Sequence, residues 1–129
     1  MLYKQYKYKF YLNMNHSVEL DGQRGAVHSH TWEISMAIAM GQEEIVRFSE
    51  IEKYISTMLQ KYQDKYLNDI PPFNVINPTL EDTCNYLFEM FSKGLREKGW
   101  LLLTMEMSET PSRVYQVTGI HPEDDFTFI

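Results

Sequence analysis

The chain contains few residues of several types, and each scarcity excludes some kinds of protein. Its single cysteine cannot form an internal disulfide, so we expect a reducing, cytoplasmic compartment. No apolar run approaches the roughly 20 residues of a membrane-spanning helix, and the first residues lack the apolar segment of a signal peptide. Basic residues are outnumbered by acidic ones, 12 to 18, which disfavours nucleic acid as a partner. We therefore expect neither membranes nor nucleic acid among its partners.

Apolar residues, in contrast, are plentiful enough to build a folded core. They make up 43% of the 129 residues, well above the content of disordered chains. A chain of this length usually folds as one domain, and no linker, repeat or low-complexity segment divides it. We predict a single domain over residues 1–129.

Two stretches alternate between apolar and polar residues with the period of a half-buried strand. In residues 6–14 the even-numbered positions are apolar, and His16 is the next position on that face. In residues 28–40 the even-numbered positions again share a face, which begins with His28 and His30. If the two strands form an antiparallel hairpin, the three histidines meet at its loop end.

Apolar residues at helical spacing predict two helices after these strands. The first covers residues 48–63 and begins with a capping box formed by Ser49 and Glu52. The second covers residues 79–99, and its apolar stripe includes Cys84, which we expect to be a core residue rather than a nucleophile.

Two further strands complete the predicted fold. The first covers residues 100–109, with Leu101, Leu103, Met105, Met107 and Glu109 on one face, and the second covers residues 112–117. The order β-β-α-α-β-β predicts an α+β fold. In that fold, two helices pack on one face of a four-stranded antiparallel sheet.

Three histidines gathered on one sheet face favour a metal site. A lone histidine on an apolar face is usually a core residue, but two at positions i and i+2, joined by a third from a neighbouring strand, indicate ligands. Three neutral imidazoles with one open position are typical of catalytic zinc, which acidifies bound water or polarises a carbonyl. We predict Zn²⁺ bound by His16, His28 and His30.

The order and spacing of these motifs resemble those of the 6-pyruvoyltetrahydropterin synthase / 6-carboxytetrahydropterin synthase family, which has the tunnelling fold. In that family a histidine that ends the first strand and an H-G-H that opens the second hold zinc. These positions match His16 and the "HSH" of residues 28–30. "YQDKYLN" and "PTLE" match two further motifs, so the resemblance covers residues 6 to about 117. The fourth histidine, His121, follows the matched region and receives no role.

The resemblance also implies a ligand and an assembly. The ligand would be a reduced pterin triphosphate such as 7,8-dihydroneopterin triphosphate. Glu109 would anchor its ring, and Thr79 and Glu81 would shape the pocket. A carboxylate can accept two parallel N–H bonds from a 2-amino-4-oxo-pyrimidine, which fits this role for Glu109. The family forms trimers that stack into hexamers with pockets between subunits, so we expect a homo-oligomer.

The residues that the family uses for proton transfer are replaced in this chain. No cysteine lies between His16 and His28, and the family's Asp-His pair falls on Gln63 and Asp64. Glutamine cannot transfer protons at neutral pH. Some family members carry a glutamate in place of the cysteine. The candidates for proton transfer are therefore Asp64 and Glu19.

The residues leave three functions open. The first is a zinc-dependent carbon–oxygen lyase of the synthase type with substituted acid/base groups. The second is a catalytically inactive homologue that binds zinc and a pterin or purine-like ring, and the third is a different reaction on a related ring. The presence of all three zinc histidines favours the first and third functions. The replacement of the family's proton-transfer residues favours the second and third. We expect a family-like zinc enzyme with altered chemistry.

Overall fold

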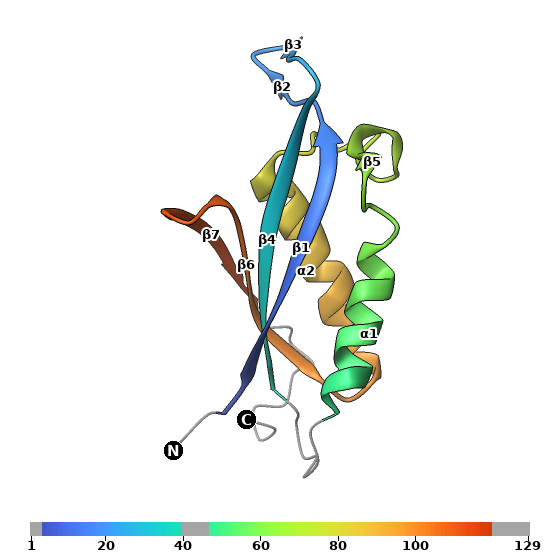
Figure 1. The fold of residues 1–129 in the computed structure, drawn as a ribbon, viewed down its shortest axis with the longest axis vertical. Helices are drawn as coiled ribbons and strands as arrows, with labels where there is room; N and C mark the ends of the chain where they lie inside the picture. The colour runs from blue at the N-terminus through green and yellow to red at the C-terminus, as the bar shows by residue number, and fades with distance from the viewer. Residues whose placement is uncertain (1–3, 40–46, 120–129) are drawn as a thin grey trace.

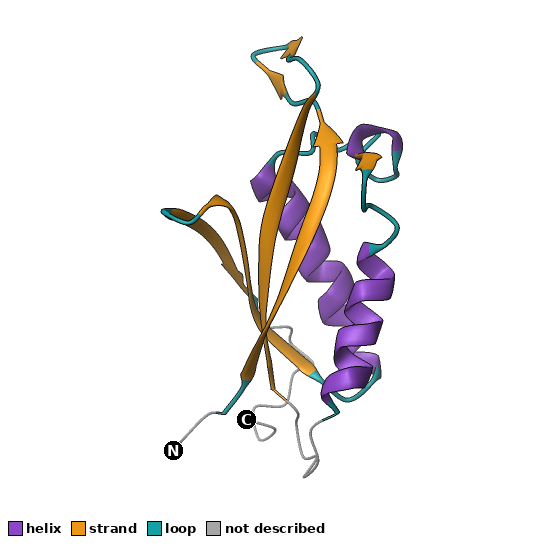
Figure 2. Ribbon diagram, in the orientation of Figure 1, coloured by secondary structure: helices purple, strands orange, loops and turns teal. Residues whose placement is uncertain are grey.

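A sheet with two helices on one face forms the body of the chain in a computed structural model that describes residues 4–39 and 47–119 (Figure 1). The long elements are β1 (Tyr6–His16), β4 (His28–Ala39), α1 (Phe48–Leu59), α2 (Leu80–Glu97), β6 (Leu101–Thr110) and β7 (Arg113–Thr118). Figure 2 shows both helices on the same side of the sheet. The predicted α+β class and the four antiparallel strands are confirmed. The predictions for Met40 and His121 lie outside the described residues.

Several short elements complete the sheet and its loops. β2 (Glu19–Leu20) and β3 (Gln23–Arg24) form a small hairpin between β1 and β4, and β5 (Lys65–Tyr66) pairs in parallel with β1. A single 3₁₀ turn, η1 (Leu67–Asp69), follows β5. The sheet order is β5-β1-β4-β6-β7. Elements of two or three residues carry no hydrophobic periodicity, so the sequence pattern did not predict them.

The register of β1 and β4 confirms the predicted hairpin. His16 pairs with His28, and Met14 pairs with His30. Because partners across an antiparallel pair point to the same face, the alternating apolar residues of both strands share the side that the helices cover. Trp32, the next residue on that face of β4, is fully buried.

The start of β6 departs from the predicted alternation. Ala37 pairs with Thr104 but Ile38 pairs with Leu102, so a β-bulge leaves Leu103 out of register. The main core cluster therefore contains Leu102, which is 1% exposed, whereas Leu101, although buried, and Leu103 lie outside that cluster. Placing those two on the face of Met105 was wrong because a bulge reverses the parity of a strand.

The two helices begin in different ways. Thr79 is the N-cap of α2, and its side chain accepts a hydrogen bond from the backbone N–H of Asp82 at 3.0 Å. α1 begins at Phe48 after Arg47, which makes no side-chain capping bond. The predicted capping box is therefore wrong, because Ser49 lies inside the helix rather than at its N-cap. No helix in the described ranges is long and apolar enough to cross a membrane.

The thiol of Cys84 is expected to resist alkylation in the folded chain. Cys84 is fully buried, and burial, reinforced by Glu81, raises its pKa to about 12. Almost no reactive thiolate then forms near pH 8. Iodoacetamide labelling, followed by mass spectrometry, should be roughly a thousandfold slower in native buffer than in urea. Equal rates in the two solvents would contradict the packing of this side chain.

Candidate metal centre and ligand pocket

Three histidine side chains meet at the loop end of the β1–β4 hairpin. One ring nitrogen from each of His16, His28 and His30 lies within 4.8 Å of the others. Their ring centroids are 4.4 to 5.0 Å apart. The register explains this arrangement, because His16 faces His28 directly and His30 is two residues farther along the same strand face.

Backbone carbonyl oxygens hold two of these rings through their Nδ1 atoms. His16 Nδ1 donates to the carbonyl oxygen of Pro78 at 2.8 Å, and His28 Nδ1 donates to that of Ala26 at 3.0 Å. In a neutral imidazole the second nitrogen then carries a lone pair. The Nε2 atoms of His16 and His28 are only 2.8 Å apart. Two lone pairs this close repel unless a proton or a cation lies between them.

The environment of His16 favours its neutral, ligating form. Its side chain is 2% exposed, and burial lowers its pKa below the ordinary value. The hydrogen bond to Pro78 opposes this shift, whereas His28 and His30 add to it. The carbonyls of Pro78 and Ala26 also fix two ring orientations, as the outer partners of metal-binding histidines do. The three residues therefore fit a cation that binds imidazole, and zinc is the common one.

A pocket of about 520 Å³ opens beside the histidines. Its walls come from the end of β1, the loop after it, the start of α2 and the β6–β7 hairpin. The lining residues are His16, Val18, Leu20, His28, His30, Thr79, Leu80, Glu81, Glu109, Thr110, Arg113, Val114 and Tyr115. The structure thus brings Glu109, Thr79 and Glu81 together with the three histidines in one cavity.

Glu109 lies near the end of β6, beside the sheet face that carries the three histidines. Its Oε2 is 3.9 Å from Nδ1 of His30, and its side chain is 37% exposed. A carboxylate in this position can accept hydrogen bonds from a ligand in the pocket while it orients His30. Thr79, the N-cap of α2, and Glu81, in its first turn, also line the pocket.

The two carboxylates predicted for proton transfer do not line this pocket. Glu19 Oε2 is 3.9 Å from a guanidinium nitrogen of Arg24, and the Glu19 side chain is half exposed. Asp64 adopts a φ of 58°, and its N–H donates to the carbonyl oxygen of Asn13 at 2.7 Å. It lines a second depression, and the other lining residues there are Asn13, Met14, Asn15, Ser29, His30 and Thr31. Neither carboxylate therefore lines the pocket of the three histidines, although Asp64 shares the second depression with His30.

Gln63 has a structural role that the sequence did not suggest. Its Oε1 accepts from the N–H of Asn13 at 2.9 Å, and its Nε2 donates to the carbonyl oxygen of Tyr11 at 2.7 Å. The side-chain amide therefore forms hydrogen bonds with backbone groups at the edge of β1, as a neighbouring strand would.

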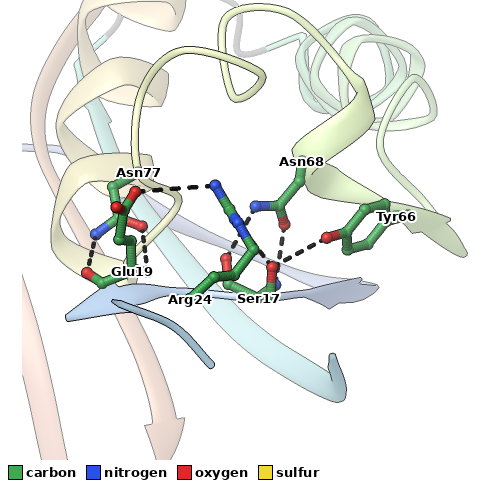
Figure 3. Close-up of polar contacts among 6 residues, drawn as sticks. All are labelled: Ser17, Glu19, Arg24, Tyr66, Asn68 and Asn77. Atoms are coloured by element: carbon green, nitrogen blue, oxygen red, sulfur yellow. Dashed lines mark hydrogen bonds and ion pairs between the residues drawn. The ribbon is translucent and has the colours of Figure 1, made fainter. Parts of the chain in front are cut away.

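Side-chain amides also fix the loop that follows His16 (Figure 3). Asn68 accepts from the N–H of Ser17 and donates to its carbonyl oxygen, both at 2.9 Å. Asn77 makes the same pair of bonds with the backbone of Glu19, at 2.8 and 2.9 Å. Since Asn77 precedes Pro78, whose carbonyl holds His16, one short segment positions both the ligand and the loop beside it.

Replacing Asn77 with alanine is expected to weaken zinc binding about tenfold to a hundredfold. The loop after His16 loses two hydrogen bonds, so the carbonyl of Pro78 and the His16 ring are held less firmly. Competition with a zinc chelator would measure the dissociation constant. Asn74→Ala is the matched control, because Asn74 is exposed in the same loop and has no hydrogen bond within the described ranges. Equal zinc affinity in the two variants would mean that Asn77 does not position His16.

Sequence reasoning missed several pocket residues. Arg113 and Val114 begin β7, whereas Val18 lies between β1 and β2 and Leu20 belongs to β2, both in the connection after β1. The first pair could have been found, because a tight β6–β7 turn brings the start of the second strand back to the Glu109 end of the first. The loop residues carry no such signal.

A family model and several solved structures of known proteins are similar to this chain. A family model described as 6-pyruvoyl tetrahydropterin synthase matches residues 5–119. The Caenorhabditis elegans 6-pyruvoyl tetrahydropterin synthase structure is similar at a TM-score of 0.75 and 15% identity, covering 91% of this chain and 96% of that chain. An uncharacterised protein from Wolinella succinogenes gives 0.68 at 12% identity, covering 91% and 98%. The Plasmodium falciparum 6-pyruvoyl tetrahydropterin synthase gives 0.60 at 14%, covering 88% and 96%. No curated protein sequence matches.

Proposed function

The chain belongs to the 6-pyruvoyl tetrahydropterin synthase family, and we propose that it is a zinc-dependent lyase that acts on the side chain of a reduced pterin. The observation that carries this proposal is the convergence of three imidazole rings, two of them held through Nδ1 by carbonyl oxygens, beside a pocket that Glu109 also lines. His16, His28 and His30 would hold the metal. Zinc on three imidazoles supplies a Lewis acid with an open position for a ligand oxygen.

Glu109 is the proposed anchor for the pterin ring. The amino-pyrimidine edge of a pterin offers two parallel N–H donors, and a carboxylate accepts both. The position of Glu109 beside His30 would orient the ring so that its side chain extends toward the three histidines. Thr79 and Glu81, at the start of α2, would contact the ring from that helix.

The chain lacks the proton-transfer residues of the family, so the proposed reaction needs other residues in that role. Glu19 is tied to Arg24 outside the pocket, so Asp64 is the better candidate. Asp64 does not line the pocket that Glu109 shares with the three histidines, although it lies in a depression with His30, and we propose that a second subunit in an oligomer brings it to a pocket. We propose a trimer or hexamer with pockets between subunits, in the reducing cytoplasm.

A catalytically inactive binding protein is the alternative. One observation favours it: within the described ranges, no carboxylate other than Glu81 and Glu109 lines the pocket. Such a protein would keep the metal and the ring without breaking a bond.

Turnover separates the two functions. The zinc-loaded chain is incubated with 7,8-dihydroneopterin and, separately, with its triphosphate, and products are followed by chromatography. A new pterin that is absent with His28→Ala and with Asp64→Asn would support the enzyme and its proton-transfer group. Binding of the pterin without any product would favour the alternative, and absence of both would refute the proposal.

A further inference from the structure

We propose that a second pocket, at the far end of α2 from the histidines, binds a small aromatic molecule that carries a negative charge. This pocket has a volume of about 660 Å³ and lies between α1 and the turn that joins α2 to β6. Figure 1 shows the start of α1 and this turn at the end of the molecule opposite to the β2–β3 hairpin. Small-molecule sites usually measure about 300 to 1,000 Å³. The proposal needs neither zinc nor a pterin, so it is independent of the proposed function.

The length of α2 separates this pocket from the histidine pocket. The helix has 18 residues, which corresponds to about 27 Å along its axis. Leu80 at its start lines the histidine pocket, whereas Lys98 at its end lines the second pocket. None of the described residues that line the second pocket belongs to β1, β5 or β7, the strands along the two edges of the sheet. Subunits that join through those edges, or through the open sheet face, would therefore leave this pocket uncovered.

Positive charge gathers at this pocket although the chain as a whole is acidic. The formal net charge of the chain is −6, yet the pocket is lined by Arg47, Lys53 and Lys98. Glu50 is the one carboxylate among the described lining residues, and it already pairs with Arg47 at 3.2 Å. Within the described ranges neither lysine forms an ion pair. The two ammonium groups can therefore attract an anion to the pocket.

Two aromatic side chains give the pocket a surface against which a ring can pack. Tyr54 comes from α1, and Trp100, which is 4% exposed, directly follows the α2–β6 turn. Lys98 Nζ lies 5.0 Å from the centroid of the Tyr54 ring, so a cation is already held at an aromatic face. Glu97 also acts on Tyr54 but does not line the pocket. A ligand ring that packs against Tyr54 would bring an acidic substituent close to Lys98.

The position of Tyr54 depends on Gly94. Glycine is unfavourable inside a helix, but a Cβ at Gly94 would overlap the Tyr54 hydroxyl, so a larger residue would displace the ring. The Tyr54 ring also packs edge-on against Phe91, with 6.4 Å between the ring centroids. These contacts hold the aromatic wall in place before a ligand arrives, which lowers the entropic cost of binding.

Two fluorescent probes test the proposal on the full chain. 1-Anilinonaphthalene-8-sulfonate and N-phenyl-1-naphthylamine share the same rings, but only the first carries a negative charge. We expect the sulfonate to bind saturably and at least about tenfold more tightly than the neutral probe at low ionic strength, with a smaller difference at high salt. Absence of saturable binding, or equal affinities for the two probes, would overturn the proposal.

Replacing Lys98 with glutamine tests the source of the charge preference. We expect Lys98→Gln to weaken binding of the sulfonate about tenfold and to leave the affinity for the neutral probe unchanged. Lys61→Gln is the matched control, because Lys61 Nζ lies 5.7 Å from the Tyr62 ring but Lys61 does not line the pocket. Equal effects of the two variants would mean that binding follows the net charge of the chain, and the proposal would be wrong.

Filling the pocket tests where the probe binds. Thr57 is an exposed lining residue of α1, so Thr57→Phe should weaken binding of both probes at least about tenfold without disturbing the core. Ser56→Phe adds the same ring at an exposed position that does not line the pocket and should bind both probes normally. Zinc-free and zinc-loaded chains should also bind the sulfonate equally. Binding that requires zinc and is unaffected by Thr57→Phe would place the probe in the histidine pocket, which would overturn this proposal but not the proposed function.

Discussion

Replacing His28 with alanine is expected to abolish stoichiometric zinc binding. The variant removes one of two Nε2 atoms that lie 2.8 Å apart, and with it a ligand that its bond to Ala26 had already oriented. Loss of one of three protein ligands should cost about 4 kcal/mol, or roughly a thousandfold in affinity. Elemental analysis after dialysis would show about one zinc per chain for the natural sequence and almost none for the variant.

Ser29→Ala is the matched control for this variant. Ser29 lies between two of the proposed ligands, but its hydroxyl donates to Asn15 on the opposite sheet face. It should therefore keep its zinc. Full metal content in His28→Ala would refute the three-histidine site, whereas loss of zinc in both variants would indicate damage to the hairpin instead.

Replacing Glu109 with glutamine is expected to weaken pterin binding about a hundredfold. The substitution keeps the shape of the side chain but removes its charge and turns one acceptor oxygen into a donor. Two charge-assisted hydrogen bonds to the ring are then lost or reversed, at a cost of about 3 kcal/mol. Calorimetry of the zinc-loaded chain with 7,8-dihydroneopterin would measure the change.

Glu106→Gln controls for the loss of a charge from β6. Glu106 lies on the same strand but pairs with Lys7 at 3.6 Å and does not line the pocket. Its variant should bind the ligand normally and also keep its zinc. Unchanged affinity in Glu109→Gln would mean that another group holds the ring.

The parts of the fold that the sequence predicted are those with strong local periodicity. Alternation along residues 6–16 and 28–38 placed the three histidines on one face, and the register confirmed that hairpin. The same rule failed at the start of β6, because the bulge near Leu103 reverses parity without any local signal in the sequence.

Long-range polar contacts account for most of what the sequence did not predict. The bonds between Asn77 and Glu19 join residues 58 positions apart, and no spacing rule connects an asparagine to a distant backbone. Gln63 is a similar case. Its position suggested a lost catalytic group, and the structure adds a role at the edge of β1. Motif spacing located the candidate ligands but not the groups that hold them.

The packing of Trp32 gives the metal centre an optical reporter. The indole lies under two of the histidines, with its centroid 5.2 Å from that of His16 and 6.2 Å from that of His30. The chain has only one other tryptophan, Trp100, which directly precedes β6. A Trp100→Phe chain would carry a single indole. Its fluorescence emission would respond to metal or ligand binding at the imidazoles, so that binding could be followed in real time without any label.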